Sequence, residues 1–228
     1  TNKTIYSAGE VVTISATTKN VGTGGSAYSS TYFYLSTDSV WDAADVYLGY
    51  DSVNSLPAGQ SESATFDVTL PKTLPAGAGT YRIIGRADAS ANITESNETN
   101  NTFAAQVSMQ VPDLVVSVLT PSVSAVGPGE SFSITATTLN SGVSSAGTSR
   151  TYFYLSSDSV LDASDTLLDY DSINALGAGL SESGTTQVRI PTSQATGAYY
   201  VIAEADGQKA LSESNEANNT ESVQITVG

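Results

Sequence analysis

Apolar and polar residues alternate along most of this chain, which is the period of half-buried β-strands. In residues 10–17, Val12, Ile14 and Ala16 alternate with hydroxyl side chains, and residues 61–70 alternate in the same way. No window of the sequence shows sustained helical periodicity. The pattern therefore predicts an all-β protein.

Nearly every predicted strand occurs twice. Residues 31–45 begin as an aromatic strand and continue into a turn that holds three Asp residues, and residues 151–165 repeat this segment. An Asn- and Glu-rich loop precedes the last predicted strand of each copy, at residues 95–101 and 213–219. A copy of roughly 110 residues is long enough to bury its own core. We therefore predict two domains, residues 1–111 and 112–228.

The second copy contains one predicted strand, Leu114 to Leu119, for which the first copy has no counterpart. Six or seven short strands separated by turn residues, found twice, indicate sandwiches of immunoglobulin type. The predicted fold is two tandem immunoglobulin-like antiparallel β-sandwiches, the first lacking its first strand. We interpret the chain as a piece of a longer array, in which neighbouring repeats are its first partners.

An ordered set of short motifs occurs in both copies. In the second copy the motifs are Tyr154-Leu155-Ser156-x-Asp158, Asp162-x-x-Asp165, Leu176-x-Ala178-Gly179, Gly197-x-Tyr199, Ala205-Asp206 and Glu213 to Asn219. In this order they resemble the CARDB domain, the cell-adhesion-related domain found in bacteria. The resemblance covers nearly the whole chain. It implies an immunoglobulin-like fold in large secreted surface proteins of bacteria or archaea, and hence an extracellular, cell-surface location.

Charge and missing residue types narrow the chemistry. There are 23 acidic residues against 8 basic ones, and the net charge of -15 repels nucleic-acid phosphates and anionic lipid head groups. No apolar run approaches membrane-spanning length. We therefore expect no nucleic-acid partner and no membrane insertion.

The chain has no Cys and no His, which excludes the Ser-His-Asp and Cys-His arrangements of hydrolases. A glycosidase that uses two carboxylates stays open on residue types alone. However, the carboxylate clusters occur in equal copies on loops, with no sign of a single asymmetric cleft. We predict that the chain is not an enzyme.

The acidic turn of each copy is the candidate metal site. Its residues are Asp38, Asp42 and Asp45 in the first copy and Asp158, Asp162 and Asp165 in the second. At spacings of i, i+4 and i+7, three carboxylates share one face if the turn coils once, and a cation would relieve their repulsion. Because only oxygen donors are available, we predict Ca²⁺. The alternative is turn chemistry, with Asp38 or Ser39 capping a short helical turn and the other carboxylates solvated.

Two further groups have a structural and a binding interpretation. The Asn-Glu loops at 95–101 and 213–219 hold oxygen donors that would suit a metal ion. Paired Asn residues often stabilise a hairpin through hydrogen bonds to their own main chain, and this structural interpretation is the one we favour. The tyrosines that point away from the predicted core are Tyr32, Tyr34, Tyr152 and Tyr154. They would suit a sugar-stacking platform, although cross-strand packing is the interpretation we favour. Trp41, which is replaced by Leu161 in the second copy, fits an apolar plug over the Asp turn.

The leading interpretation is a non-catalytic extracellular module, a spacer or adhesive segment of a large bacterial or archaeal surface protein, stabilised by Ca²⁺ at its Asp loops. Its partners would be neighbouring repeats and a surface protein or glycan. The alternative is a carbohydrate-binding module of a secreted enzyme. Binding to glycans would favour the alternative, and a Ca²⁺-dependent rise in melting temperature without glycan binding would favour the first.

Overall fold

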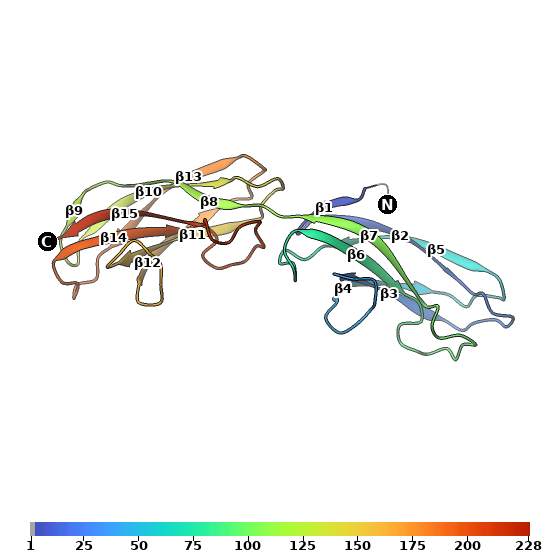
Figure 1. Ribbon diagram of the computed structural model, residues 1–228. Helices are drawn as coiled ribbons and strands as arrows, with labels where there is room; N and C mark the ends of the chain where they lie inside the picture. The colour runs from blue at the N-terminus through green and yellow to red at the C-terminus, as the bar shows by residue number, and fades with distance from the viewer. Residues whose placement is uncertain (1–2) are drawn as a thin grey trace. The chain divides into compact units, whose positions relative to one another are not determined.

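The computed structural model describes residues 3–228, and the chain divides into two compact units, Thr1–Gln110 (unit 1) and Val111–Gly228 (unit 2). Both units are built from strands, as Figure 1 shows, and no helix occurs within residues 3–228. None of the described segments is therefore a helix that could cross a membrane. The division falls one residue before the predicted boundary.

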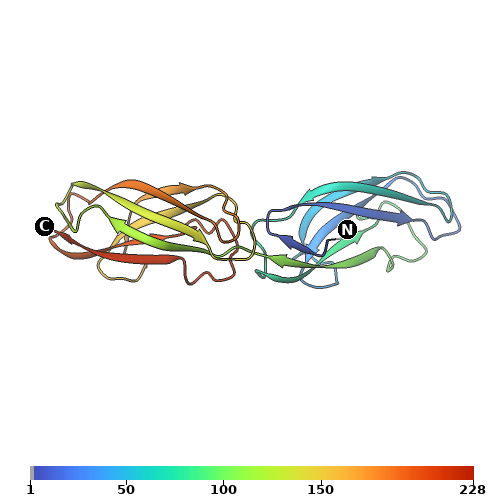
Figure 2. The same ribbon diagram turned by 90° about the horizontal axis from the view of Figure 1, so that it is seen from above.

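Unit 1 is a sandwich of two sheets. Its strands are β1 (Ile5–Ser7), β2 (Val11–Lys19), β3 (Ser29–Ser36), β4 (Val46–Val53), β5 (Ser61–Thr69), β6 (Gly79–Arg86) and β7 (Thr102–Gln110). One sheet has the order β1-β7-β6-β3-β4, and β2 pairs with β5 in the other. The two layers of the unit are visible from above in Figure 2.

Unit 2 repeats this plan with one additional strand. Its strands are β8 (Leu114–Pro121), β9 (Ala125–Val126), β10 (Ser131–Asn140), β11 (Ser149–Ser156), β12 (Thr166–Ile173), β13 (Ser181–Arg189), β14 (Gly197–Glu204) and β15 (Thr220–Val227). The sheets have the orders β12-β11-β14-β15-β9 and β13-β10-β8. The predicted fold, two tandem sandwiches with the first strand present only in the second, is confirmed: β8 has no counterpart among the described strands of unit 1.

Three details differ from the strands that the sequence predicts. β1 and β9 were not predicted; each is a short strand that runs parallel to the last strand of its unit. From the sequence, residues 46–48 after the Asp turn predict only a short strand, but β4 extends to Val53. In its pairing with β3 the register shifts between Phe33 and Tyr34, which leaves Leu48 as an extra residue. Such a bulge moves the following side chains to the other face, so simple alternation could not reveal the whole strand.

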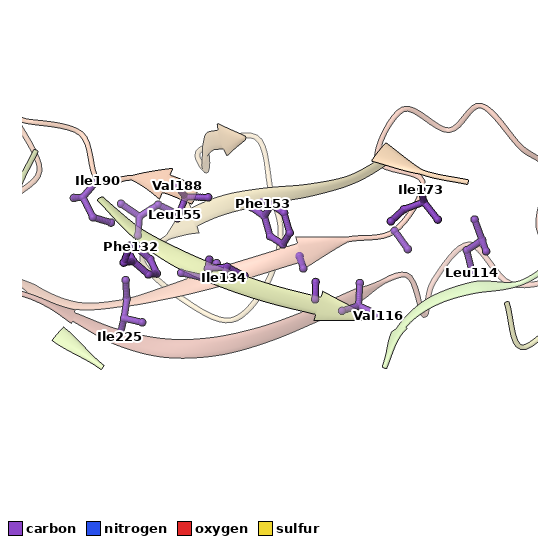
Figure 3. Close-up of a cluster of buried hydrophobic side chains, with 14 of the residues drawn as sticks. Leu114, Val116, Phe132, Ile134, Phe153, Leu155, Ile173, Val188, Ile190 and Ile225 are labelled. Carbon is purple, nitrogen blue, oxygen red and sulfur yellow. The ribbon is translucent and has the colours of Figure 1, made fainter. Parts of the chain in front are cut away.

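The core of each unit lies between its two sheets. In unit 2, Figure 3 shows Leu114 and Val116 of β8 in the same cluster as Ile134 and Phe153. The central strand of the large sheet in unit 1, β6, lies between β3 and β7 and is buried on both faces. Ile84 is fully buried, and it lies opposite Tyr34 of β3 in the register of the sheet.

Candidate functional site

The two Asp loops, residues 37–45 and 157–165, connect β3 to β4 and β11 to β12. In unit 1 the loop begins at the buried Ser36, whose hydroxyl oxygen accepts the N–H of Asp38 at 3.1 Å. Asp38 Oδ1 then accepts the N–H of Val40 at 2.8 Å. These two bonds fix the first turn of the loop.

Asp42 and Asp45 fix the second turn. Asp42 Oδ1 accepts the N–H of Ala44 at 2.7 Å, and Asp45 Oδ2 accepts the N–H of Asp42 at 3.0 Å. In unit 2 the same pattern is formed by Asp158, Asp162 and Asp165. In addition, the Ser164 hydroxyl donates to Asp162 Oδ1 at 2.6 Å and lowers the pKa of Asp162.

The structure therefore places all six predicted Asp residues in two surface loops. In each loop one hydrogen bond joins two of the three Asp residues: the N–H of Asp42 donates to the Asp45 carboxylate, and the N–H of Asp162 donates to the Asp165 carboxylate. Every one of these carboxylates accepts a main-chain N–H of its own loop, whereas the turn-chemistry alternative expected only Asp38 or Ser39 to form such a bond and the other carboxylates to be solvated. Within residues 3–228, no group of three or more acidic side chains is arranged to hold a metal ion. Ca²⁺ at the Asp loops stays a prediction.

The large sheet of unit 1 carries an aromatic face, made of Tyr32, Tyr34, Trp41, Tyr47 and Tyr50. Tyr32 is opposite Tyr50 and Tyr34 opposite Tyr47 in the β3–β4 register, so these rings are cross-strand neighbours. Ring centroids of Tyr32 and Tyr34 lie 5.6 and 5.7 Å from that of Tyr47, in edge-on geometry. Tyr47 and Tyr50 are nevertheless 50% and 57% exposed, so the face is open to solvent.

Trp41 belongs to this aromatic face and does not plug the Asp turn. Its ring lies 5.8 Å from that of Tyr34, and the guanidinium of Arg86 stands over it at 4.0 Å. This position over β3 and β6 corrects the expectation from sequence. The loop that carries Trp41 thus folds back onto the sheet.

Unit 2 has a smaller version of the aromatic face. Tyr152 is 5.6 Å from Tyr170, but leucines stand where unit 1 has Trp41 and Tyr47. The Tyr154 hydroxyl donates to Glu204 Oε2 at 3.2 Å. Burial, together with the neighbouring carboxylate, raises the pKa of Tyr154 to about 12. The faces of the two units are therefore not chemically equivalent.

The Asn-Glu loop of unit 2 contains a buried acid that sequence reasoning missed. Glu213 is 6% exposed; its Oε2 accepts the N–H of Leu114 and its Oε1 accepts the Asn219 amide at 3.0 Å. Burial raises the pKa of Glu213 to about 7, although both hydrogen bonds oppose the shift. The only signal in the sequence was the recurrence of Glu and Asn at the two ends of this loop. In unit 1, Glu95 accepts from Asn101 at 3.1 Å in the matching way.

Comparison with known proteins identifies the family. The CARDB family model matches residues 1–105 and 111–223. Among curated protein sequences, none matches this chain. A CARDB domain from Pyrococcus furiosus, whose crystal structure is a complex with di-metal ions, is 22% identical and has a TM-score of 0.40. The match covers 52% of this chain and 94% of that one.

Two other solved structures are similar. A domain of a proposed cell-surface protein from Methanosarcina acetivorans is 22% identical, with 52% of this chain and 93% of that chain covered and a TM-score of 0.39. β-Glucosidase 3B from Thermotoga neapolitana is 17% identical; the match covers 54% of this chain but 17% of the enzyme, with a TM-score of 0.38. The family match covers nearly all of both units, and the chain therefore belongs to the CARDB family, of which it contains two tandem copies.

Proposed function

We propose that this chain is a non-catalytic extracellular module, a spacer or adhesive segment of a large bacterial or archaeal surface protein. Membership of the CARDB family in two tandem copies is the observation that carries the proposal. The use of the acidic side chains supports it. In both units they stabilise turns and loop ends through main-chain hydrogen bonds, as expected of a scaffold.

Ca²⁺ binding at the Asp loops is the finer part of this proposal. Each carboxylate uses one oxygen on a main-chain amide, which leaves its second oxygen for a hard cation. An ion there would link the two turns of each loop.

Calorimetric titration with CaCl₂ tests this on the full chain and on the double variant Asp42→Ala/Asp162→Ala. We expect binding heat and a melting temperature that rises by a few degrees in the parent, with both lost in the variant. Melting both proteins in chelator separates Ca²⁺ binding from turn formation. Without Ca²⁺, any lower melting temperature of the variant comes from the loss of the turn hydrogen bonds of Asp42 and Asp162. Asp67→Ala, which removes a carboxylate outside the loops, is the control. A parent chain that melts at the same temperature in millimolar Ca²⁺ and in chelator would leave the Asp loops as turns alone.

A carbohydrate-binding module is the second candidate, and the aromatic face of unit 1 favours it. Tyr47 and Tyr50 expose half or more of their surface on one sheet face, which is unusual for large aromatic residues without a partner. A glycan array with the full chain distinguishes the two functions. Binding that is lost in Tyr47→Ala/Tyr50→Ala but kept in Leu167→Ala/Tyr170→Ala would favour this second function.

A further inference from the structure

The loop between β6 and β7 of unit 1 carries an acceptor motif for N-linked glycans. The motif is Asn, any residue except Pro, and then Ser or Thr, and Asn97-Glu98-Thr99 matches it. Among the described residues the same motif occurs at Asn92, Asn100 and Asn218. Because Asn, Ser and Thr are common in this chain, the motif alone does not select a site, and the surroundings of each Asn decide.

The amide of Asn218 is already used by the fold of unit 2. Its Nδ2 donates to Asp113 Oδ2 at 3.2 Å, and the side chain is half-buried. The next residue of the motif, Asn219, is 7% exposed. An enzyme that transfers a glycan must reach this nitrogen from solvent, so it would have to break the contact first. Asn218 therefore carries the motif without an accessible acceptor.

Asn97, by contrast, is exposed, and so are Glu98 and Thr99, which complete its motif. Asn97 Oδ1 accepts the N–H of Thr99 at 3.0 Å and the Thr99 hydroxyl at 2.7 Å. Because a main-chain N–H can only donate, these bonds identify the atom as the amide oxygen. Nδ2 lies on the other side of the planar amide, and among residues 3–228 it has no hydrogen-bond partner. The nitrogen that would react is therefore open to solvent.

Hydrogen bonds within the loop hold Asn97 in this position. The N–H of Glu95 donates to Glu98 Oε1 at 2.8 Å, and the Asn101 amide donates to Glu95 Oε1 at 3.1 Å. These bonds join the two ends of the loop segment that contains Asn97. The motif is therefore presented by an ordered turn.

The other two exposed motifs of unit 1 lack this arrangement. Asn92 and Asn100 are exposed like Asn97. Within the described part of the chain, however, neither amide oxygen accepts a hydrogen bond from the hydroxyl residue of its own motif. Asn97 therefore combines exposure, a free amide nitrogen and an oriented hydroxyl residue.

Unit 2 contains the same turn without the motif. Asn215 Oδ1 accepts the N–H of Ala217 at 3.0 Å, as Asn97 Oδ1 accepts that of Thr99, and both Asn215 and Ala217 are exposed. Ala217 lacks the hydroxyl group that the motif requires. The two loops thus form a matched pair for testing that requirement.

We propose that Asn97 is an acceptor site for an N-linked glycan. In the transfer, Asn97 Nδ2 attacks C1 of the first sugar of a lipid-pyrophosphate-linked oligosaccharide. A bond forms between Nδ2 and C1, and the bond between C1 and the pyrophosphate oxygen breaks. The lipid pyrophosphate leaves with the electron pair of that bond, and the amide gives up one proton. The proposal rests on the proposed extracellular location, because such glycans are found on surface loops of secreted proteins.

Transfer in vitro to the folded full chain tests the site. The chain is incubated with a single-subunit oligosaccharyltransferase and a polyprenyl-pyrophosphate-linked oligosaccharide that begins with N-acetylglucosamine, and glycopeptides are mapped by mass spectrometry. We expect modification of Asn97 to exceed that of Asn218 at least about tenfold, because the enzyme needs a motif on an open surface loop. The assay contains no cells, so its failure would remove the glycan site and leave the proposed extracellular function untouched.

Three variants separate the motif from the fold. Thr99→Ala should lower transfer to Asn97 at least about tenfold, whereas Thr99→Ser, which keeps the hydroxyl, should retain most of it. Ala217→Thr should create a new acceptor at Asn215 in unit 2. The melting temperature of each variant should differ from that of the parent by no more than about 4 °C, because the changed side chains are exposed.

A synthetic peptide of residues 93–101, which contains only the Asn97 motif, is the control for the enzyme. The proposal is overturned if the peptide is modified and Asn97 of the folded chain is not, since the fold then hides the site. It is equally overturned if neither is modified, since the enzyme then rejects this motif. Equal modification of Asn218 and Asn97 would also overturn it, because the exposed turn would then give no selection.

Discussion

Glu213 shows how strongly one residue depends on its surroundings. As an exposed loop residue it would be an ordinary surface carboxylate, but in unit 2 it is covered by β8 and hydrogen-bonded to Leu114 and Asn219. Covering the carboxylate favours its protonated form, because the charged form loses hydration. The stability of unit 2 is therefore coupled to pH through this side chain.

The pH dependence has a definite sign. The pKa of Glu213 is raised from 4.5 to about 7 by folding, so the folded state binds the proton more tightly than the unfolded state. This stabilisation is complete below pH about 4.5 and is lost as the pH rises through about 7. We expect the free energy of unfolding of unit 2 to fall by about 3 kcal/mol across that window. Urea unfolding at pH 5 and pH 8 measures it.

Variants isolate the contribution of Glu213 from the general repulsion of a chain with net charge -15. Glu213→Gln should lack this part of the fall, whereas Glu221→Gln, an exposed acid on β15, should keep it. If the parent and Glu213→Gln show the same change between the two pH values, Glu213 is ionised in both states.

At the scale of elements, the loop after β10 and the start of β8 approach each other closely in unit 2. We expect Gly142→Ala to lower the stability of unit 2 by about 2 kcal/mol, because its Cβ meets main-chain atoms of Pro112 and Asp113 that cannot rotate away. Gly22→Ala, the same change in unit 1, should alter stability by less than about 0.5 kcal/mol. Thermal unfolding of both variants measures the difference, and equal losses would contradict this account of the glycine.

The sequence predicts most of these elements because alternation and turn residues are local signals. Val12 and Ile14 are buried as their alternation requires, and Asp38 forms the turn that its position after a strand suggests. β1 and β9 escape prediction because strands of two or three residues show no period. The burial of Glu213 escapes it for another reason: its partner Leu114 lies 99 residues earlier in the chain.

At the scale of the whole molecule, the two units share a plan but differ in how completely their cores are covered. Unit 2 buries Leu114 and Val116 on the edge of β10, at 0% and 6% exposure, and unit 1 has a groove at that place. Fully burying one such side chain stabilises a fold by about 1.5–3 kcal/mol. Unit 1 should therefore be the less stable unit.

Trp41 makes this difference measurable, since it is the only tryptophan in the chain and lies in unit 1. We expect two thermal transitions by circular dichroism, separated by about 10 °C, with tryptophan fluorescence following only the lower one. The double variant Trp41→Leu/Leu161→Trp moves the reporter to the matching position of unit 2, and its fluorescence should follow the upper transition. If the fluorescence of both reporters instead follows one transition at the same temperature, the expected difference in stability between the units is absent. The open edge of β2 would then not lower the stability of unit 1.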